Sequence, residues 1–150
     1  MKRGACLLVA AVVLGGCGDG AARLSKSQYE AKLQSAFSAA NGELSPAPRA
    51  AGSISLLKQI GSAYGDIATA LRGQKAPLDV ERLNRKLATA AAARSAALKV
   101  LVARLEAAPA GNRRRLLAQY DAARFGEDDF DAAVAALEEK GYKFRPSAGT

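Results

Sequence analysis

Apolar residues recur every three or four positions through most of the chain after residue 24, the spacing of an amphipathic helix. The first such helix is expected to start near residue 24 and to end at Asn41-Gly42, a dipeptide typical of helix ends. Two pairs at its start have the spacing of a capping box, Ser25 with Gln28 and Ser27 with Glu30. Its predicted apolar face consists of Tyr29, Leu33, Phe37 and Ala40.

A linker and a second helix are predicted next. The stretch 45–52 contains two prolines, which disfavour helix in the residues before them. The second helix is expected to begin at Ser53 or Ser55 and to end at Gly73. Its predicted inward positions are Ile54, Leu57, Ile60, Tyr64, Ile67 and Leu71.

The third predicted helix is the longest. It begins at Pro77, where a missing amide proton is tolerated, and continues to about Ala108. Asp79 and Glu81 lie in its first turn, where the helix dipole favours carboxylates. Its predicted inward positions are Leu83, Leu87, Ala90, Leu98, Leu101 and Leu105.

Two shorter helices complete the pattern. Pro109 and Gly111 close the third helix, and a fourth segment runs from about Asn112 to Gly126. Its predicted inward positions are Leu116, Leu117, Tyr120 and Ala123. The last helix ends at Lys140-Gly141. Its predicted inward positions are Phe130, Ala133, Val134 and Leu137.

The beginning of the chain has a different pattern. Lys2 and Arg3 precede an apolar run over 7–14, followed by Gly15-Gly16-Cys17, and these are the parts of an export signal. The run is about half the ~20 residues that span a bilayer. The segment Leu14-Gly15-Gly16-Cys17 resembles the lipobox of bacterial lipoproteins. The resemblance implies that Cys17 is the lipid attachment site and the first mature residue; the alternatives are an ordinary secretory signal with a chance cysteine or a buried apolar segment.

No segment shows the period of two that a strand would have. The expected fold class is therefore all-α, an antiparallel bundle of four to five helices after a cleaved signal peptide. We expect the signal peptide over 1–16, a flexible tether over 17–23, the bundle domain over 24–145 and a disordered tail over 146–150.

The segment Arg23–Glu30, which follows the lipobox, contains Leu24-Ser25-Lys26. It resembles the mature start of small helical lipoproteins of uncharacterised function from high-GC actinobacteria. Members of that group typically carry one cysteine in the first helix and another near the C-terminus. Here Phe37 and Gly141–Phe144 occupy those regions without a cysteine. Because the group has no established activity, the resemblance implies no functional residue beyond Cys17.

Composition excludes several kinds of chemistry. Histidine is absent, and the two cysteines are Cys6, inside the expected signal peptide, and Cys17. A mature chain would therefore have no free thiol, no disulfide and no imidazole for general base catalysis or metal binding. The formal net charge of +8 falls to +6 when Lys2 and Arg3 are removed, which favours a position near anionic headgroups or wall polymers.

Two short motifs have a functional and a structural interpretation. Ser55-Leu56-Leu57-Lys58 matches the Ser-x-x-Lys of serine acyl-enzymes, but the companion motifs are missing, so we interpret Ser55 as a helix cap. Gly61 and Gly65 form a small-xxx-small pair, which permits close approach of two helices. A tight crossing inside the bundle is favoured over a homodimer interface.

Two charged clusters are the remaining candidates. Acidic residues open the last helix and could attract a hard cation, although helix capping explains them better: Glu127, Asp128, Asp129 and Asp131. A basic group could bind phosphates, but a solvated or membrane-facing patch is favoured: Arg85, Lys86, Arg94, Lys99, Arg104, Arg113, Arg114 and Arg115. Nucleic acid is not expected as a partner, because its binding would require aromatic residues or a reading helix alongside the basic group, and because the expected location is extracytoplasmic.

Two alternative hypotheses for the function remain. The first is a non-enzymatic, lipid-anchored domain on the extracytoplasmic side of the cell membrane that binds a partner protein, a wall polymer or a lipid headgroup. The alternative is an extracytoplasmic enzyme or enzyme inhibitor that acts through carboxylates and lysines. We expect no catalytic residue, metal or cofactor. A water-excluding pocket with two or more convergent ionisable groups would favour the alternative.

Overall fold

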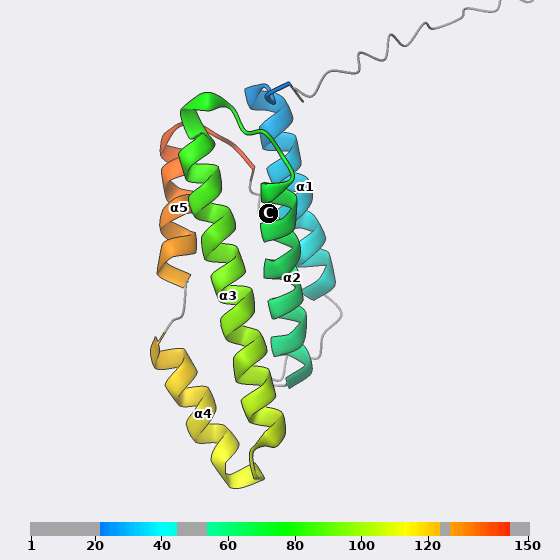
Figure 1. Ribbon diagram of the computed structural model, residues 1–150, viewed down its shortest axis with the longest axis vertical. Coiled ribbons are helices and arrows are strands. Elements are labelled where there is room, and N and C mark those ends of the chain that lie inside the picture. Colours follow the sequence, from blue (N-terminus) through cyan, green and yellow to red (C-terminus); the bar gives the residue numbers. More distant parts are fainter. Residues whose placement is uncertain (1–21, 45–53, 124–126, 145–150) are drawn as a thin grey trace, which may run out of the picture.

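The computed structural model describes residues 22–44, 54–123 and 127–144, without the side chains of 41–44 and 120–123 (Figure 1). Within these ranges the chain forms five α-helices, one short 3-10 helix (η1) and no strand. The elements are α1 (Lys26–Leu44), α2 (Ile54–Arg72), η1 (Leu78–Val80), α3 (Glu81–Ala107), α4 (Ala110–Ala123) and α5 (Glu127–Glu139). The predicted all-α bundle is confirmed.

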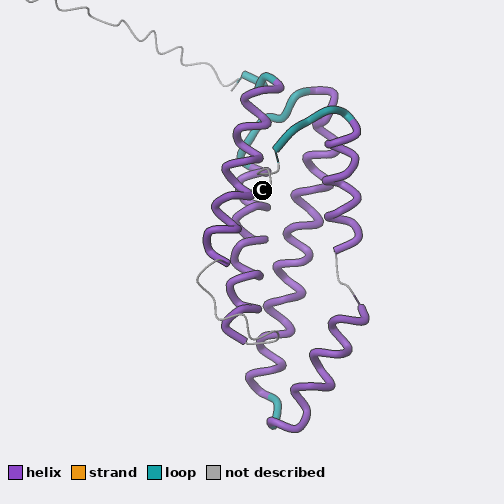
Figure 2. The backbone as a smooth tube through the Cα atoms, turned by 180° about the vertical axis from the view of Figure 1, so that it is seen from behind, coloured by secondary structure: helices purple, strands orange, loops and turns teal. Residues whose placement is uncertain are grey.

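Helix α3 is the centre of the arrangement. It packs most extensively against α2, which in turn packs against α1, and these three helices alternate in direction (Figures 1 and 2). Helices α4 and α5 both run opposite to α3 and follow one another along its length. One half of the bundle therefore has four helices in cross-section, and the other half has only α2, α3 and α4.

The two ends of the bundle are far apart. We call residues 22–26, 73–80 and 140–142 the N-terminal end, because the described chain begins there beside η1. We call residues 104–115 the α4 end; it lies at the opposite extreme of the molecule (Figure 1). A helix of the length of α3 spans about 40 Å, so a charge at one end is screened from the other by several Debye lengths.

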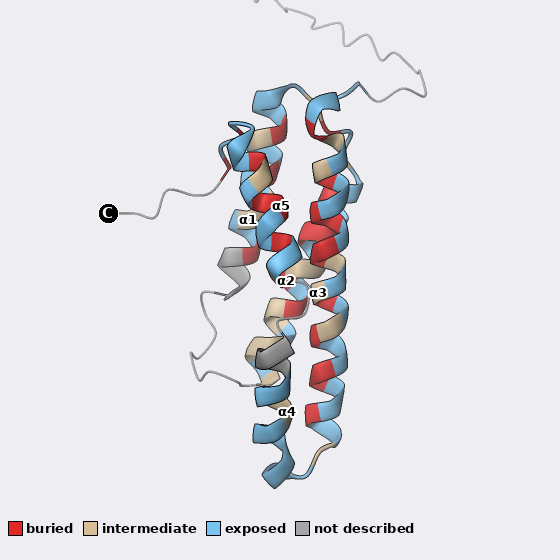
Figure 3. Ribbon diagram, turned by 90° about the vertical axis from the view of Figure 1, so that its left-hand side faces the viewer, coloured by how far each residue is buried: buried red, intermediate tan, exposed pale blue. Residues whose placement is uncertain are grey.

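The main hydrophobic core fills the four-helix half. It joins Tyr29 and Leu33 of α1 to large side chains of every other helix except α4 (Figure 3). The half-buried Phe37 extends this core, because its ring centroid lies 5.9 Å from that of Phe130 and 5.5 Å from that of Phe144. Helix α1 is thus an integral part of the bundle, as its apolar pattern predicts.

The helix boundaries confirm some sequence expectations and correct others. Ser25 and Gln28 form the capping box, with Ser25 N donating to Gln28 Oε1 at 2.9 Å and Gln28 N donating to Ser25 Oγ at 3.3 Å. The prediction that α1 ends at Asn41-Gly42 is wrong, because the helix continues to Leu44. A glycine in a helix costs only about 1 kcal/mol, which the packing of Ala40 on the core can offset.

The later helix boundaries also confirm some expectations and correct others. Gly73 follows the last residue of α2 as predicted, whereas regular helix after Pro77 is delayed to Glu81 by the 3-10 turn. Gly111 lies inside α4 instead of before it. Gly141, at φ 78°, closes α5 in a Schellman motif that returns Tyr142 to the core. The predicted signal peptide with Cys17, the linker 45–52, the break at Gly126 and the tail 146–150 lie outside the described residues.

Candidate functional site

The lysine of the Ser-x-x-Lys motif is engaged in an ion pair. Lys58 Nζ lies 2.6 Å from Glu106 Oε1 of α3, so its ammonium is paired with a carboxylate across the α2–α3 interface. Ser55 is exposed in the first turn of α2. The motif therefore stands at a helix start, next to an inter-helix ion pair.

The glycine pair of α2 forms the crossing with α3. Ser95 Oγ donates to the carbonyl oxygen of Gly61 at 2.6 Å, and a Cβ on Gly61 would lie 3.3 Å from Leu98 Cβ. At Gly65 a Cβ would lie 3.2 Å from Ser95 Oγ. Both glycines are thus required for close packing inside the bundle, as their spacing predicts.

The acidic residues Glu127, Asp128 and Asp129 lie in the first turn of α5, and Glu127 forms an ion pair. Glu127 Oε1 lies 3.2 Å from an Arg94 guanidinium nitrogen, and the same guanidinium lies over the ring of Tyr64 at 4.7 Å from its centroid. Among the described residues no group of three or more acidic or sulfur ligands could hold a metal ion. Arg94 is therefore part of an interior contact and not of a phosphate-binding surface.

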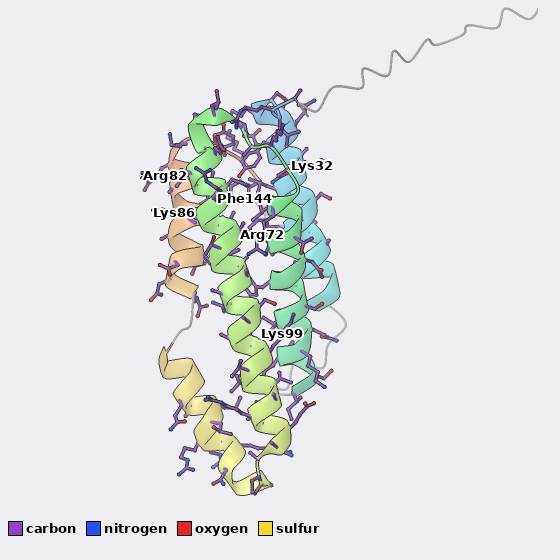
Figure 4. The ribbon with its side chains drawn as sticks, in the orientation of Figure 1. Lys32, Arg72, Arg82, Lys86, Lys99 and Phe144 are labelled. Atoms are coloured by element: carbon purple, nitrogen blue, oxygen red, sulfur yellow. The ribbon has the colours of Figure 1, made fainter. Side chains whose placement is uncertain are left out.

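The basic residues grouped by sequence do not form one patch. Arg85 and Lys86 line the groove between α3 and α5, whereas Lys99 lines the groove between α2 and α3. Figure 4 shows Arg82 and Lys86 together on the α5 side of α3, well separated from Lys99. The run Arg113–Arg115 opens α4 at the far end of the molecule. The structure thus divides the predicted basic surface into distinct parts.

The groove between α3 and α4 combines apolar surface with excess positive charge. Its volume is about 470 Å³. The lining residues are Ala96, Ala97, Val100, Leu101, Arg104, Leu116 and Gln119. Val100 is 53% exposed and is one of two large hydrophobic side chains in the described residues that are exposed. Residues 95–119 contain five basic side chains and one carboxylate, Glu106, which already pairs with Lys58.

Sequence analysis missed this groove. Leu116 and Leu117 were expected to face the interior, yet both are only partly buried. Val100 lies off the inward face predicted for α3 and gave no signal of its own. The groove forms where Val100 of α3 lies beside the loosely packed α4, and the sequence alone does not determine that α4 lies there.

A polar network stabilises the N-terminal end. Tyr29 Oη donates to Asn84 Oδ1 at 3.0 Å, and Asn84 Nδ2 donates to the carbonyl oxygen of Leu71 at 3.1 Å. Burial raises the pKa of the Tyr29 phenol, and the charges of Tyr142 and Asp79 add to this effect. Burial and the hydrogen bond to Asp79 raise the pKa of Tyr142 to about 12. Both phenols are therefore neutral donors in the fold.

The first described residues are fixed to the α2–α3 connection. Leu24 N donates to the carbonyl oxygen of Lys75 at 2.9 Å, and an Arg23 guanidinium nitrogen donates to that of Ala76 at 3.0 Å. Another Arg23 nitrogen lies 3.0 Å from Glu81 Oε2. The point at which the chain enters the bundle is thus held beside η1. Within the described residues, none of the helices has the length and apolar character needed to span a membrane.

Comparison with family models, with curated proteins and with solved structures gives no match for this chain. Its function is therefore argued from its own residues.

Proposed function

We propose that the chain is a lipoprotein anchored through acylated Cys17 on the extracytoplasmic side of the cell membrane, with a bundle that binds a partner without catalysis. The observation that carries the proposal is the succession of Lys2-Arg3, the apolar run and Leu14-Gly15-Gly16-Cys17. Two or more acyl chains are sufficient for stable attachment to a bilayer. The fixed entry of the chain at Arg23 and Leu24 supports an anchor at that end.

The α3–α4 groove is the binding surface that the geometry favours. Its apolar lining suits the apolar face of a helix, and the arginines around it suit carboxylates, which they bind with two parallel hydrogen bonds. The occupant we propose is an acidic, amphipathic helix of a partner protein. Wall polymers and lipid headgroups, the other partners consistent with the charge, lack the apolar face that Val100 and Leu116 would contact.

The alternative, an enzyme or inhibitor that uses carboxylates and lysines, would use the α2–α3 groove of about 510 Å³. Lys58 and Glu106 converge there, but their side chains are 57% and 49% exposed. Water therefore reaches both groups, and the ion pair has little of the electrostatic advantage of a closed site. This exposure supports the binding function over the alternative.

The anchor is tested by Cys17→Ser in the full chain, expressed with radiolabelled palmitate. Wild-type protein should be labelled and recovered with membranes, whereas the variant should lose the label and remain unprocessed. Cys6→Ser is the matched control and should label normally. Normal labelling of Cys17→Ser would contradict the proposal.

The binding surface is tested with a synthetic acidic amphipathic helix and the membrane-anchored protein in vesicles of neutral lipid. Val100→Glu and Arg104→Glu should each weaken binding by at least fivefold, and binding to the wild type should weaken with salt because the charges are exposed. Lys32→Glu, an exposed change on α1, is the control and should change affinity by less than about twofold. Equal affinities for all variants would exclude the α3–α4 groove.

A further inference from the structure

The N-terminal end of the bundle presents one large apolar side chain to solvent. Leu78 is 72% exposed, although its neighbours Ala76 and Val80 are buried at 2% and 0%. The turn that carries it is fixed, because Val80 N donates to the carbonyl oxygen of Pro77 at 3.2 Å and Asp79 accepts a hydrogen bond from Tyr142. Leu78 is therefore held outward by a rigid turn, at an unfavourable cost in water.

The expected lipid attachment site is tied to the end of the bundle that carries this leucine. Cys17 precedes Arg23 by six residues, a distance of about 20 Å at most for an extended chain. Leu24 is hydrogen-bonded to Lys75, and Leu78 follows Lys75 by three positions, at most about 10 Å. A lipid on Cys17 therefore tethers the N-terminal end of the bundle, and not the α4 end, to the bilayer.

The charges around Leu78 are compatible with an anionic surface. Lys75 and Lys140 are exposed, and neither has an ion-pair partner among the described residues. Of the nearby carboxylates, Asp79 accepts from Tyr142 Oη and Glu81 pairs with Arg23 and Arg85, whereas Glu139 is exposed beside Lys140. The N-terminal end is nevertheless basic, since it contains Arg23, Lys26, Lys75 and Lys140 against one carboxylate, Asp79. Two free lysines thus flank an exposed leucine at the end that carries the anchor.

We infer that this end rests on the membrane, with Leu78 in the headgroup layer and Lys75 and Lys140 against anionic lipid. The inference depends on the lipid anchor proposed above. It fixes the orientation of the bundle, because the opposite end with Arg113–Arg115 then lies about 40 Å from the bilayer. The α3–α4 groove would extend outward, accessible to a partner.

The experiment compares the two exposed apolar positions in the lipid-anchored protein. The mature chain is expected to have no free thiol, so Leu78→Cys and Val100→Cys each provide one site for an environment-sensitive fluorophore. In vesicles containing phosphatidylglycerol, a headgroup-level quencher should reduce emission from position 78 at least threefold more than from position 100. Equal quenching at both positions would overturn the inference, and a label at 100 that is quenched more would indicate the reverse orientation.

Charge variants test the contribution of the two lysines in the protein labelled at position 78. With the label at 78, Lys75→Gln and Lys140→Gln should each lower the ratio of docked to undocked protein roughly fivefold on anionic vesicles. Arg114→Gln and Arg115→Gln, each a matched loss of one charge at the α4 end, should leave that ratio unchanged. If these pairs act alike, the orientation is wrong even though the protein is anchored. A chain that does not float with vesicles overturns the anchor itself, and the orientation with it.

Discussion

Helices α4 and α5 run in the same direction along one side of α3, yet they contribute differently to the fold. Helix α5 buries Phe130, Ala133, Val134 and Leu137, spaced at one face of the helix. Helix α4 buries none of its described side chains, and its two leucines are half covered (Figure 3). Position beside α3 is therefore not sufficient for burial, and the apolar pattern of each helix decides it.

Charge separates the same two helices. Residues 127–144 contain six carboxylates and two lysines, whereas α4 carries three consecutive arginines, Arg113–Arg115, in its first two turns. The acidic helix is fixed by the core, by the Schellman motif at Gly141 and by the Arg94–Glu127 ion pair. The basic helix, α4, has few such contacts, so its exposed side chains are free to contact a partner. The comparison assigns stability to α5 and leaves α4 for the binding that we propose.

The first prediction tests this assignment with one truncation in each helix. Phe130→Ala should lower the free energy of unfolding by about 3–5 kcal/mol, because the ring is 6% exposed and contacts the rings of Tyr64 and Phe37. Leu116→Ala should cost less than about 1 kcal/mol, because that side chain is half covered. Urea denaturation of both variants measures the difference.

Phe37→Ala is a further comparison within the four-helix half. The aromatic contacts of Phe37 indicate a cost near 3 kcal/mol, the low end of the range for buried aromatic residues, because the side chain is half-buried. If Phe130→Ala and Leu116→Ala instead lower the free energy of unfolding by similar amounts, α4 contributes as much to the fold as α5.

The fold was predictable because periodic apolar spacing survives packing. The inward positions of the last helix, Phe130 to Leu137, are all buried, and the Ser25–Gln28 capping box is one of two pairs that the sequence offered. The continuation past Asn41-Gly42 was not predictable, since local propensity is weaker than the tertiary contacts of a helix. The 3-10 turn before Glu81 likewise depends on the contact of Asp79 with Tyr142.

The candidate surfaces were less predictable than the fold. Asn84 gave no signal, because a polar residue on a helix is usually exposed, whereas here it accepts from Tyr29 and is 6% exposed. Leu78 lies within the range predicted for the third helix and gave no signal of its own. Its exposure depends on how the chain returns from α2, which spacing alone does not determine.

The second prediction concerns two helical glycines with different surroundings. Gly61→Ala should destabilise the protein by about 1–2 kcal/mol, because the new methyl group meets Leu98 Cβ at 3.3 Å across the α2–α3 crossing. Gly111→Ala has no atom within 4 Å of the new Cβ and should stabilise it by about 0.5–1 kcal/mol through helix propensity. Thermal unfolding should show shifts of opposite sign. A gain at both positions would mean that the crossing can widen without cost.

The third prediction uses the phenol that links α5 to the N-terminal end. Tyr142→Phe removes the donor to Asp79 and should cost about 1 kcal/mol at neutral pH, measured by urea denaturation.

The same phenol makes stability depend on pH in a defined direction. The pKa of Tyr142 is raised from 10.0 to about 12 in the fold, so its contribution is complete below pH 10 and is lost as the pH rises toward 12. The buried Tyr29 phenol, whose pKa is raised too, adds a loss of the same sign. The free energy of unfolding of Tyr142→Phe should therefore decrease less steeply between pH 10 and 12 than that of the wild type, although it is lower at pH 7. Because a phenolate at position 142 would face the Asp79 carboxylate, its ionisation should weaken the attachment of the end of α5 to η1. Urea denaturation of both proteins at pH 7 and between pH 10 and 12 measures the difference, and an equal loss of stability in the wild type and in Tyr142→Phe would contradict this role of the phenol.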